Sequence, residues 1–114
     1  MVIVRKRINP SGIPFKGNVI VADEKIISYC KEVAKALRLV SLHDIDLMTD
    51  VNGDPVVLEV NPRPSGSMVA SMVAGYPLVD WVISNKLNLN VKYSSPEYDL
   101  YIDKKLNVAQ KKLK

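Results

Sequence analysis

The amino-acid sequence predicts an α+β fold, in which a small antiparallel β-sheet is packed with helices. Three observations support this prediction. Residues 2–8 are rich in β-branched side chains that alternate loosely with charges, which favours a strand. Residues 23–39 carry apolar side chains at helical spacing. From residue 42 the apolar period changes to two, and an Asn-Gly pair separates two such runs, which predicts an antiparallel hairpin over residues 42–61.

Local signals mark the ends of these elements. Residues 9–17 contain two prolines and two glycines, which predicts a loop after the first strand. Asp23 is expected to cap the following helix, because its side chain can accept a hydrogen bond from a free backbone N–H of the first turn. Cys30 lies on the apolar face of this helix. Because the chain has one cysteine, we expect Cys30 to be a small buried hydrophobe.

The residues after the hairpin predict two more helices. Prolines at 62 and 64 end the second strand, because each removes a backbone donor and holds its predecessor extended. A serine at 65 or 67 then caps a short helix over residues 68–74, which ends at Gly75. Pro77 starts another helix, whose apolar face continues to Leu87. Beyond residue 88 the pattern weakens, and the lysine-rich residues 104–114 are at best a marginal, solvated helix.

Length and composition exclude several classes of protein. A chain of 114 residues accommodates one small domain, and its 47% hydrophobic and 25% charged residues are typical of soluble globular domains. No apolar run approaches the roughly 18 residues of a membrane span, so we expect no membrane partner. The charges that follow the first four residues oppose a secretory signal, so we expect a cytoplasmic protein.

The chain is basic, which is compatible with a polyanionic partner. Its net charge of +4 and pI of about 9.2 suit either nucleic acid or ATP. Nucleic-acid binding on a sheet face uses aromatic side chains interleaved with lysines. The chain has one Phe and one Trp, and its tyrosines lie mostly beyond residue 92, which argues against a nucleic-acid partner.

The predicted hairpin gathers polar side chains on one face. A type I′ turn, with positive φ at Asn52 and Gly53, places Asp46 opposite Glu59. The same register places Asp44 opposite Asn61 on that face. The other face is apolar and is expected to be buried against the helices: Ile45, Leu47, Leu58 and Val60.

These polar side chains predict a site for a divalent cation. Two carboxylates directly opposite each other destabilise a hairpin by roughly 0.2–1 kcal/mol, and a cation compensates for this repulsion. Asp46, Glu59 and Asn61 offer the hard oxygen ligands that Mg²⁺ or Mn²⁺ prefers. The alternative is a solvated polar face. Asp44, at the start of its strand, is interpreted as an ordinary exposed carboxylate.

An anion-binding element follows the second strand directly. Arg63 is flanked by prolines, and a guanidinium held beside a bound metal can contact phosphate oxygens. Its alternative role is a surface ion pair with Glu59. Ser65 opens a helix whose free N–H groups can bind an anion.

The sequence L-E-V-N-P-R-P-S-G-S at residues 58–67 resembles the E-x-N-x-R motif of ATP-grasp enzymes, and E-V-N-P-R is similar to the carbamoyl-phosphate-synthase large-subunit branch. The resemblance covers about residues 4–89. The stretch A-G-Y-P-L at residues 74–78 is similar to the family's A-T-G-x-P-L. The resemblance implies that the fold is the C-terminal subdomain of an ATP-grasp domain.

The resemblance also implies functional roles. Glu59 and Asn61 would bind magnesium, and Asp46 would complete the metal site. Arg63 would contact phosphate or the acyl-phosphate intermediate as a catalytic residue. The strand with Arg5 and Arg7 resembles a basic strand of the family, and both side chains would bind the phosphates of ATP; the alternative is an ordinary polar strand face.

The implied reaction is that of an ATP-dependent carboxylate–amine ligase. ATP, with Mg²⁺ or Mn²⁺, would phosphorylate a carboxylate or bicarbonate, and an amine or ammonia would displace the phosphate. The family also has a glycine-rich lid and upstream nucleotide-binding lysines, which we do not find among this chain's five glycines and 114 residues.

We therefore expect residues 1–90 to be a partial ATP-grasp domain and residues 91–114 to be an extension or tail. The expected partner is the missing N-terminal ATP-grasp portion or another chain that supplies it. A homo-oligomer is also compatible with the sequence. The alternative function is a non-catalytic binding or regulatory remnant that acts through protein contact.

Overall fold

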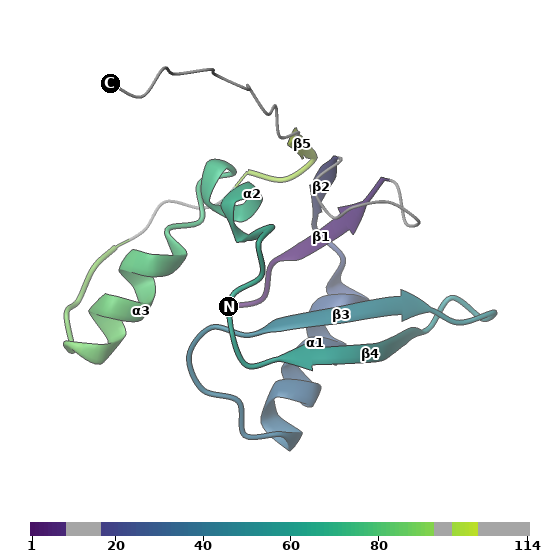
Figure 1. The fold of residues 1–114 in the computed structure, drawn as a ribbon, viewed down its shortest axis with the longest axis horizontal. Coiled ribbons are helices and arrows are strands. Elements are labelled where there is room, and N and C mark those ends of the chain that lie inside the picture. The colour runs from purple at the N-terminus through teal and green to yellow at the C-terminus, as the bar shows by residue number, and fades with distance from the viewer. Residues whose placement is uncertain (9–16, 93–96, 103–114) are drawn as a thin grey trace, which may run out of the picture.

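The computed structural model describes residues 1–8, 17–92 and 97–102. Within these residues, strands and helices form two antiparallel sheets with helices against them, which confirms the α+β fold (Figure 1). The elements in chain order are β1 (Val4–Arg7), β2 (Asn18–Val21), α1 (Glu24–Ala36), β3 (Asp44–Thr49), β4 (Pro55–Asn61), α2 (Met68–Val73), α3 (Leu78–Lys86) and β5 (Leu100–Ile102). None of the helices in the described part is long and apolar enough to cross a membrane.

The first sheet contains two strands that the sequence patterns did not predict. β2 lies in its centre, with β1 on one side and β5 on the other. Ile20 of β2 is fully buried and packs with Ala74 and Tyr76 from the junction of α2 and α3. We expected these two helices to cover the hairpin. Instead, the junction between them packs against the β1–β2–β5 sheet, where Leu78 at the start of α3 adjoins the buried cluster.

Helix α1 begins as expected. The Asp23 carboxylate accepts a hydrogen bond from the backbone N–H of Ile26 at 3.0 Å, which caps the first turn. Ile27 and Cys30 are buried on its inner face, and burial raises the pKa of the Cys30 thiol. The helix ends at Ala36 rather than near residue 39, because Arg38 adopts a left-handed φ of 51°. α1 packs behind the hairpin and contacts β4 (Figure 1).

The hairpin tip differs from the expected type I′ turn. Gly53 has a positive φ of 79°, but Asn52 does not. The loop has three residues between the paired Asp50 and Asp54, and the Gly53 N–H donates to the Asp50 carbonyl. The Asp50 carboxylate accepts hydrogen bonds from the backbone N–H groups of Asn52 and Asp54, each at 2.8 Å. Because Asp50 stabilises the tip with its own side chain, only Gly53 needs the left-handed conformation.

A β-bulge in β4 corrects the register that this longer loop would produce. Near the tip, Leu47 pairs with Val57; past the irregularity, Asp46 pairs with Glu59. The extra residue between them is Leu58, which is 61% exposed. The expectation that Leu58 belongs to the buried apolar face is therefore wrong, because a bulged residue leaves the alternation of its strand. The predicted pairs Asp46–Glu59 and Asp44–Asn61 are confirmed.

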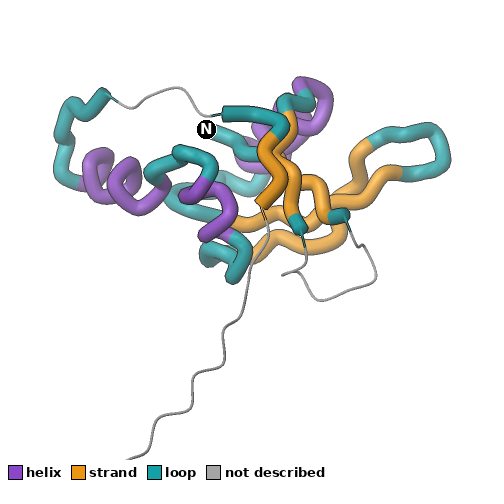
Figure 2. The backbone as a smooth tube through the Cα atoms, turned by 90° about the horizontal axis from the view of Figure 1, so that it is seen from above, coloured by secondary structure: helices purple, strands orange, loops and turns teal. Residues whose placement is uncertain are grey.

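The chain after the hairpin follows the predicted order. α2 is preceded by Ser67, and Gly75 adopts a φ of 92° directly after the helix. Pro77 precedes α3. Seen from above, the hairpin tip projects to the side away from α2 and α3 (Figure 2). Most of the predicted loop and the predicted tail helix lie outside the described residues. The division at residue 90 stays a prediction, and residues 100–102 pair with β2 as β5.

Candidate functional site

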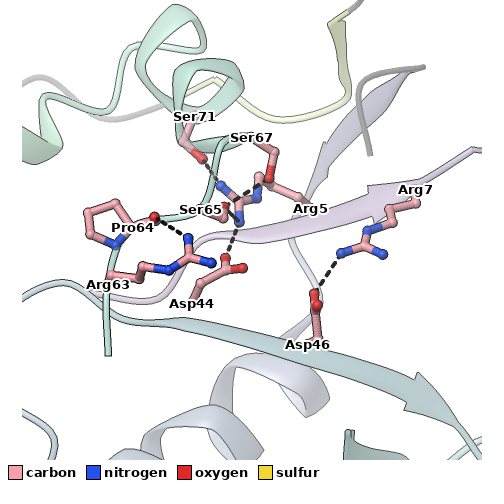
Figure 3. Close-up of polar contacts among 9 residues, drawn as sticks. All are labelled: Arg5, Arg7, Asp44, Asp46, Arg63, Pro64, Ser65, Ser67 and Ser71. Atoms are coloured by element: carbon pink, nitrogen blue, oxygen red, sulfur yellow. Dashed lines mark hydrogen bonds and ion pairs between the residues drawn. The ribbon is translucent and has the colours of Figure 1, made fainter. Parts of the chain in front are cut away.

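Two arginine–aspartate pairs connect the two sheets. Arg5 and Arg7 alternate along β1, so both side chains leave the strand on one face. Opposite them, Asp44 and Asp46 alternate along β3. Arg5 pairs with Asp44 at 2.5 Å and Arg7 pairs with Asp46 at 2.7 Å (Figure 3). β1 and the hairpin belong to different sheets, so these pairs fix the position of the acidic face against β1.

Arg5 lies at the centre of a polar network. Besides Asp44, its guanidinium donates to Ser65 Oγ at 3.1 Å and to Ser71 Oγ at 3.4 Å. Ser65 Oγ also lies 2.9 Å from Ser67 Oγ. The Arg5 and Asp44 side chains are only 17% and 12% exposed. Arg5 therefore joins β1, β3, the segment after β4 and α2, as Figure 3 shows.

This network corrects the interpretation of Asp44 as an ordinary exposed carboxylate. Asp44 is largely buried and is paired. The sequence did contain a signal, because two basic residues and two acidic residues each recur at a spacing of two on predicted strands. Such spacing matches when two strands present their side chains to each other. The contribution of Ser71, 66 residues from Arg5, left no comparable signal in the sequence.

The predicted metal ligands lie together on the hairpin. Asp46 is directly opposite Glu59, and Asn61 is two residues further along β4 on the same face. Glu59 is exposed, whereas Asp46 and Asn61 are partly buried. In the described part of the chain, no group of three or more His, Cys, Asp or Glu side chains is arranged to hold a metal. The predicted metal ligands do not form such a group, because they consist of the two carboxylates of Asp46 and Glu59 and the amide of Asn61.

The predicted phosphate ligands are placed less uniformly. Arg63 is exposed, and its Nη1 donates to the carbonyl of its neighbour Pro64 at 3.4 Å (Figure 3). Within the described residues it forms no ion pair with Glu59, so that alternative role is not observed. Ser65 is engaged with Arg5 and Ser67, and α2 begins only at Met68. The structure thus brings Arg5 and Ser65 together and leaves Arg63 toward solvent.

A broad cleft of about 1120 Å³ adjoins these groups. Its polar lining includes side chains of β1, the hairpin and the segment before α2: Arg5, Arg7, Asp44, Asp46, Glu59 and Ser65. Apolar side chains of β1, α1, the hairpin, α2 and α3 also line it. The cleft therefore offers carboxylate oxygens and guanidinium groups beside an apolar wall. Such a combination can hold a cation and an anion next to each other.

Comparison with known proteins assigns the chain to a family. A family model described as "ATP-grasp in the biosynthetic pathway with Ter operon" matches residues 1–111. The chain is also 36% identical over 85 residues to a carbamoyl phosphate synthase large chain from Clostridium acetobutylicum. That match covers 73% of this chain and 8% of the relative, so the chain spans a small part of the relative's length. No solved structure matches the chain. With nearly its whole length matched by the family model, the chain belongs to the ATP-grasp family.

Proposed function

We propose that this chain contributes the Mg-ATP phosphate-binding part of an ATP-dependent carboxylate–amine ligase. The observation that supports the proposal is the cross-strand register. Asp46 stands opposite Glu59, with Asn61 on the same face of β4. The ATP-grasp family membership and the likeness to a carbamoyl phosphate synthase large chain support the choice of ligand and reaction class.

The chemistry of the side chains fits Mg²⁺ or Mn²⁺. All three proposed ligands bind through oxygen, which a hard cation prefers. Glu59 is open to solvent, and the Asp46 side chain is 33% exposed, so water or phosphate oxygens have room to complete the coordination. Three protein ligands leave positions for the nucleotide, as is usual where magnesium is bound together with phosphates.

The arginines would hold and neutralise the phosphates. Arg63 is exposed and has no acidic partner within the described residues, so its guanidinium is available to a phosphate oxygen. In this role Arg63 stabilises negative charge on the transferred group, while Arg7 lies on the same side as Asp46. The predicted phosphate roles of Arg5, Arg7 and Ser65 remain part of the proposal. When bound, Mg-ATP supplies the phosphoryl group that activates a carboxylate or bicarbonate.

The remaining contacts to the nucleotide are proposed to come from another ATP-grasp segment. The matched relative is far longer than this chain, so its other segments have room to supply a lid and an adenine pocket. We propose that such a segment, on the same polypeptide or on a partner chain, completes the enzyme. The cytoplasmic location stays a prediction.

Metal binding by the chain tests the proposal. The wild-type chain is expected to bind Mn²⁺. Binding is measured as the loss of the electron paramagnetic resonance signal of the free ion. Glu59→Gln should weaken it by at least about tenfold, because a ligand oxygen loses its charge. Glu32→Gln on exposed α1 is the matched control and should bind as the wild type does. Unchanged binding in Glu59→Gln, or a folded wild type that binds no Mn²⁺, would contradict the proposal.

A second candidate is a non-catalytic module that acts through protein contact. It is favoured by large apolar side chains that α2 and α3 expose, among them Val69, Val73 and Ile83. It is also consistent with Asp44 and Asp46 both being neutralised by arginines already. A folded chain without Mn²⁺ affinity would support this candidate over the first.

A further inference from the structure

The two β1 arginines have different environments, although they are only two residues apart. Arg5 has three side-chain partners and is 17% exposed. Arg7 has one partner, Asp46, and is 42% exposed. Asp44 and Asp46 differ in the same way, at 12% and 33% exposed. The outer pair is therefore the one that solvent and solutes can reach.

We propose that Arg7 is an exchangeable counter-ion of Asp46, which a divalent cation displaces when it binds between Asp46 and Glu59. This inference rests on the proposed function, because it assumes that the cation binds there. It adds a role for Arg7 that the family motif does not assign: Arg7 holds the empty site together and is released when the site fills.

The charges on this face explain why a counter-ion is needed. Asp46 and Glu59 are cross-strand neighbours, and like charges in that position repel each other. Arg7 places its guanidinium 2.7 Å from Asp46 Oδ1 and so offsets this repulsion. Glu59 forms no ion pair among the described residues, so Asp46 receives the compensating charge.

The same contact must change when a cation arrives. Asp46 Oδ1 accepts the Arg7 hydrogen bond, and a metal bound to this carboxylate would stand close to the guanidinium. Two positive groups at that separation repel each other. The exposed pair is worth little, about 0.2–1 kcal/mol for pairs of this kind, so the cation can displace it. Arg5 cannot be displaced as readily, because its three partners surround it.

Displacement predicts an increase in metal affinity when Arg7 is removed. Arg7→Gln should bind Mn²⁺ about two- to fivefold more tightly than the wild type, which is the upper part of the range that an exposed ion pair is worth. Lys6→Gln is the matched control. It removes one positive charge from the neighbouring position, which faces the other side of β1, and Lys6 is exposed. Its Mn²⁺ affinity should stay within about twofold of the wild type.

The release itself can be observed by nuclear magnetic resonance of the arginine side chains. In the metal-free chain, rotation of both the Arg5 and the Arg7 guanidinium groups should be hindered, because each is bound to a carboxylate. Added Mg²⁺ should restore fast rotation to Arg7 and leave Arg5 hindered. Arg5 is thus a control inside the same molecule.

The outcomes separate this inference from the proposed function. If the folded wild type binds no Mn²⁺, the proposed metal site is wrong and the inference is wrong with it. If the wild type binds Mn²⁺ through Glu59 but Arg7→Gln binds equally or more weakly, only the inference is overturned. A guanidinium of Arg7 that stays hindered at saturating Mg²⁺ would overturn it as well. Tighter binding in Arg7→Gln, together with Arg7 released in the wild type, supports it.

Discussion

Replacing Arg5 by glutamine should destabilise the fold far more than the same change at Arg7. Arg5→Gln leaves the Asp44 carboxylate without its cation at a position where its side chain is 12% exposed. It also removes the donors to Ser65 and Ser71. Arg7→Gln leaves Asp46 at 33% exposure, where water can solvate it. Both variants replace arginine by glutamine, so they differ only in the burial of the arginine and in the number of its partners.

The expected magnitudes follow from these exposures. Breaking a fully buried ion pair by removing one partner costs about 3–5 kcal/mol. The residual exposure of Arg5 and Asp44 lowers this cost, so we expect Arg5→Gln to lower the free energy of unfolding by about 2–4 kcal/mol. An exposed pair is worth about 0.2–1 kcal/mol, which is the expectation for Arg7→Gln. At about 4–8 °C per kcal/mol for small domains, Arg5→Gln should lower Tm by at least about 8 °C.

Urea unfolding followed by far-ultraviolet circular dichroism measures both changes, and a double-mutant cycle isolates the pair. Asp44→Asn leaves Arg5 unpaired, whereas the double variant Arg5→Gln with Asp44→Asn leaves no buried charge. The double variant should therefore be more stable than the sum of the two single effects predicts. Additivity within about 0.5 kcal/mol, or equal losses in Arg5→Gln and Arg7→Gln, would refute the reasoning.

Three further predictions concern the hairpin tip and α1. Gly53→Ala places a side chain at a φ of 79°, which should lower the free energy of unfolding, measured in urea, by about 1–2 kcal/mol. No atom lies within 4 Å of the added Cβ, so the loss should come from the backbone conformation alone. A larger loss would contradict this cause. Burial raises the pKa of Cys30, so its reactive thiolate is scarce at pH 8, and iodoacetamide should modify the native chain at least about tenfold more slowly than the urea-unfolded chain; equal rates would contradict this. Hydrogen bonds from the backbone N–H groups of Asp54 and Asn52 lower the pKa of Asp50 below 3.8, so this carboxylate stabilises the tip above that pH, and its contribution is lost as the pH falls through the lower folded value. A carboxyl titration by nuclear magnetic resonance should give a midpoint below 3.8, and a midpoint at or above it would contradict the assignment.

Local signals in the sequence predicted the elements that depend on local interactions. Asp23 at the start of α1, Gly75 after α2 and Pro77 before α3 each act on neighbouring backbone, so they can be read from the sequence. β5 was missed because it has three residues, too few to establish a period. β2, with the sequence Asn-Val-Ile-Val, was missed because its apolar run shows no alternation with polar residues. β5 pairs with β2 across about 80 residues, and such pairing leaves no local pattern. β2 also pairs with β1, which lies shortly before it in the chain.

The candidate site was predicted in part for a similar reason. The pairing of Asp46 with Glu59 was predicted from a turn type that the chain does not adopt, and it holds because the bulge at Leu58 offsets the longer loop. Pattern reasoning does not detect such compensating irregularities, because each alone would shift the register. The inward position of Asp44 was missed because it depends on β1, which lies 39 residues away in the chain.

The bulge also makes the two halves of the hairpin differ in how well they are expected to tolerate changes in sequence. The residues of the tip are exposed, and α1 holds them through Lys25, which pairs with Asp54. The residues at the other end carry the acidic face. Because Leu58 takes up one residue of offset, the pairing of Glu59 with Asp46 does not share the register of the outer half. Changes of length at the tip are therefore expected to be tolerated among related chains better than a change in length between residues 59 and 61.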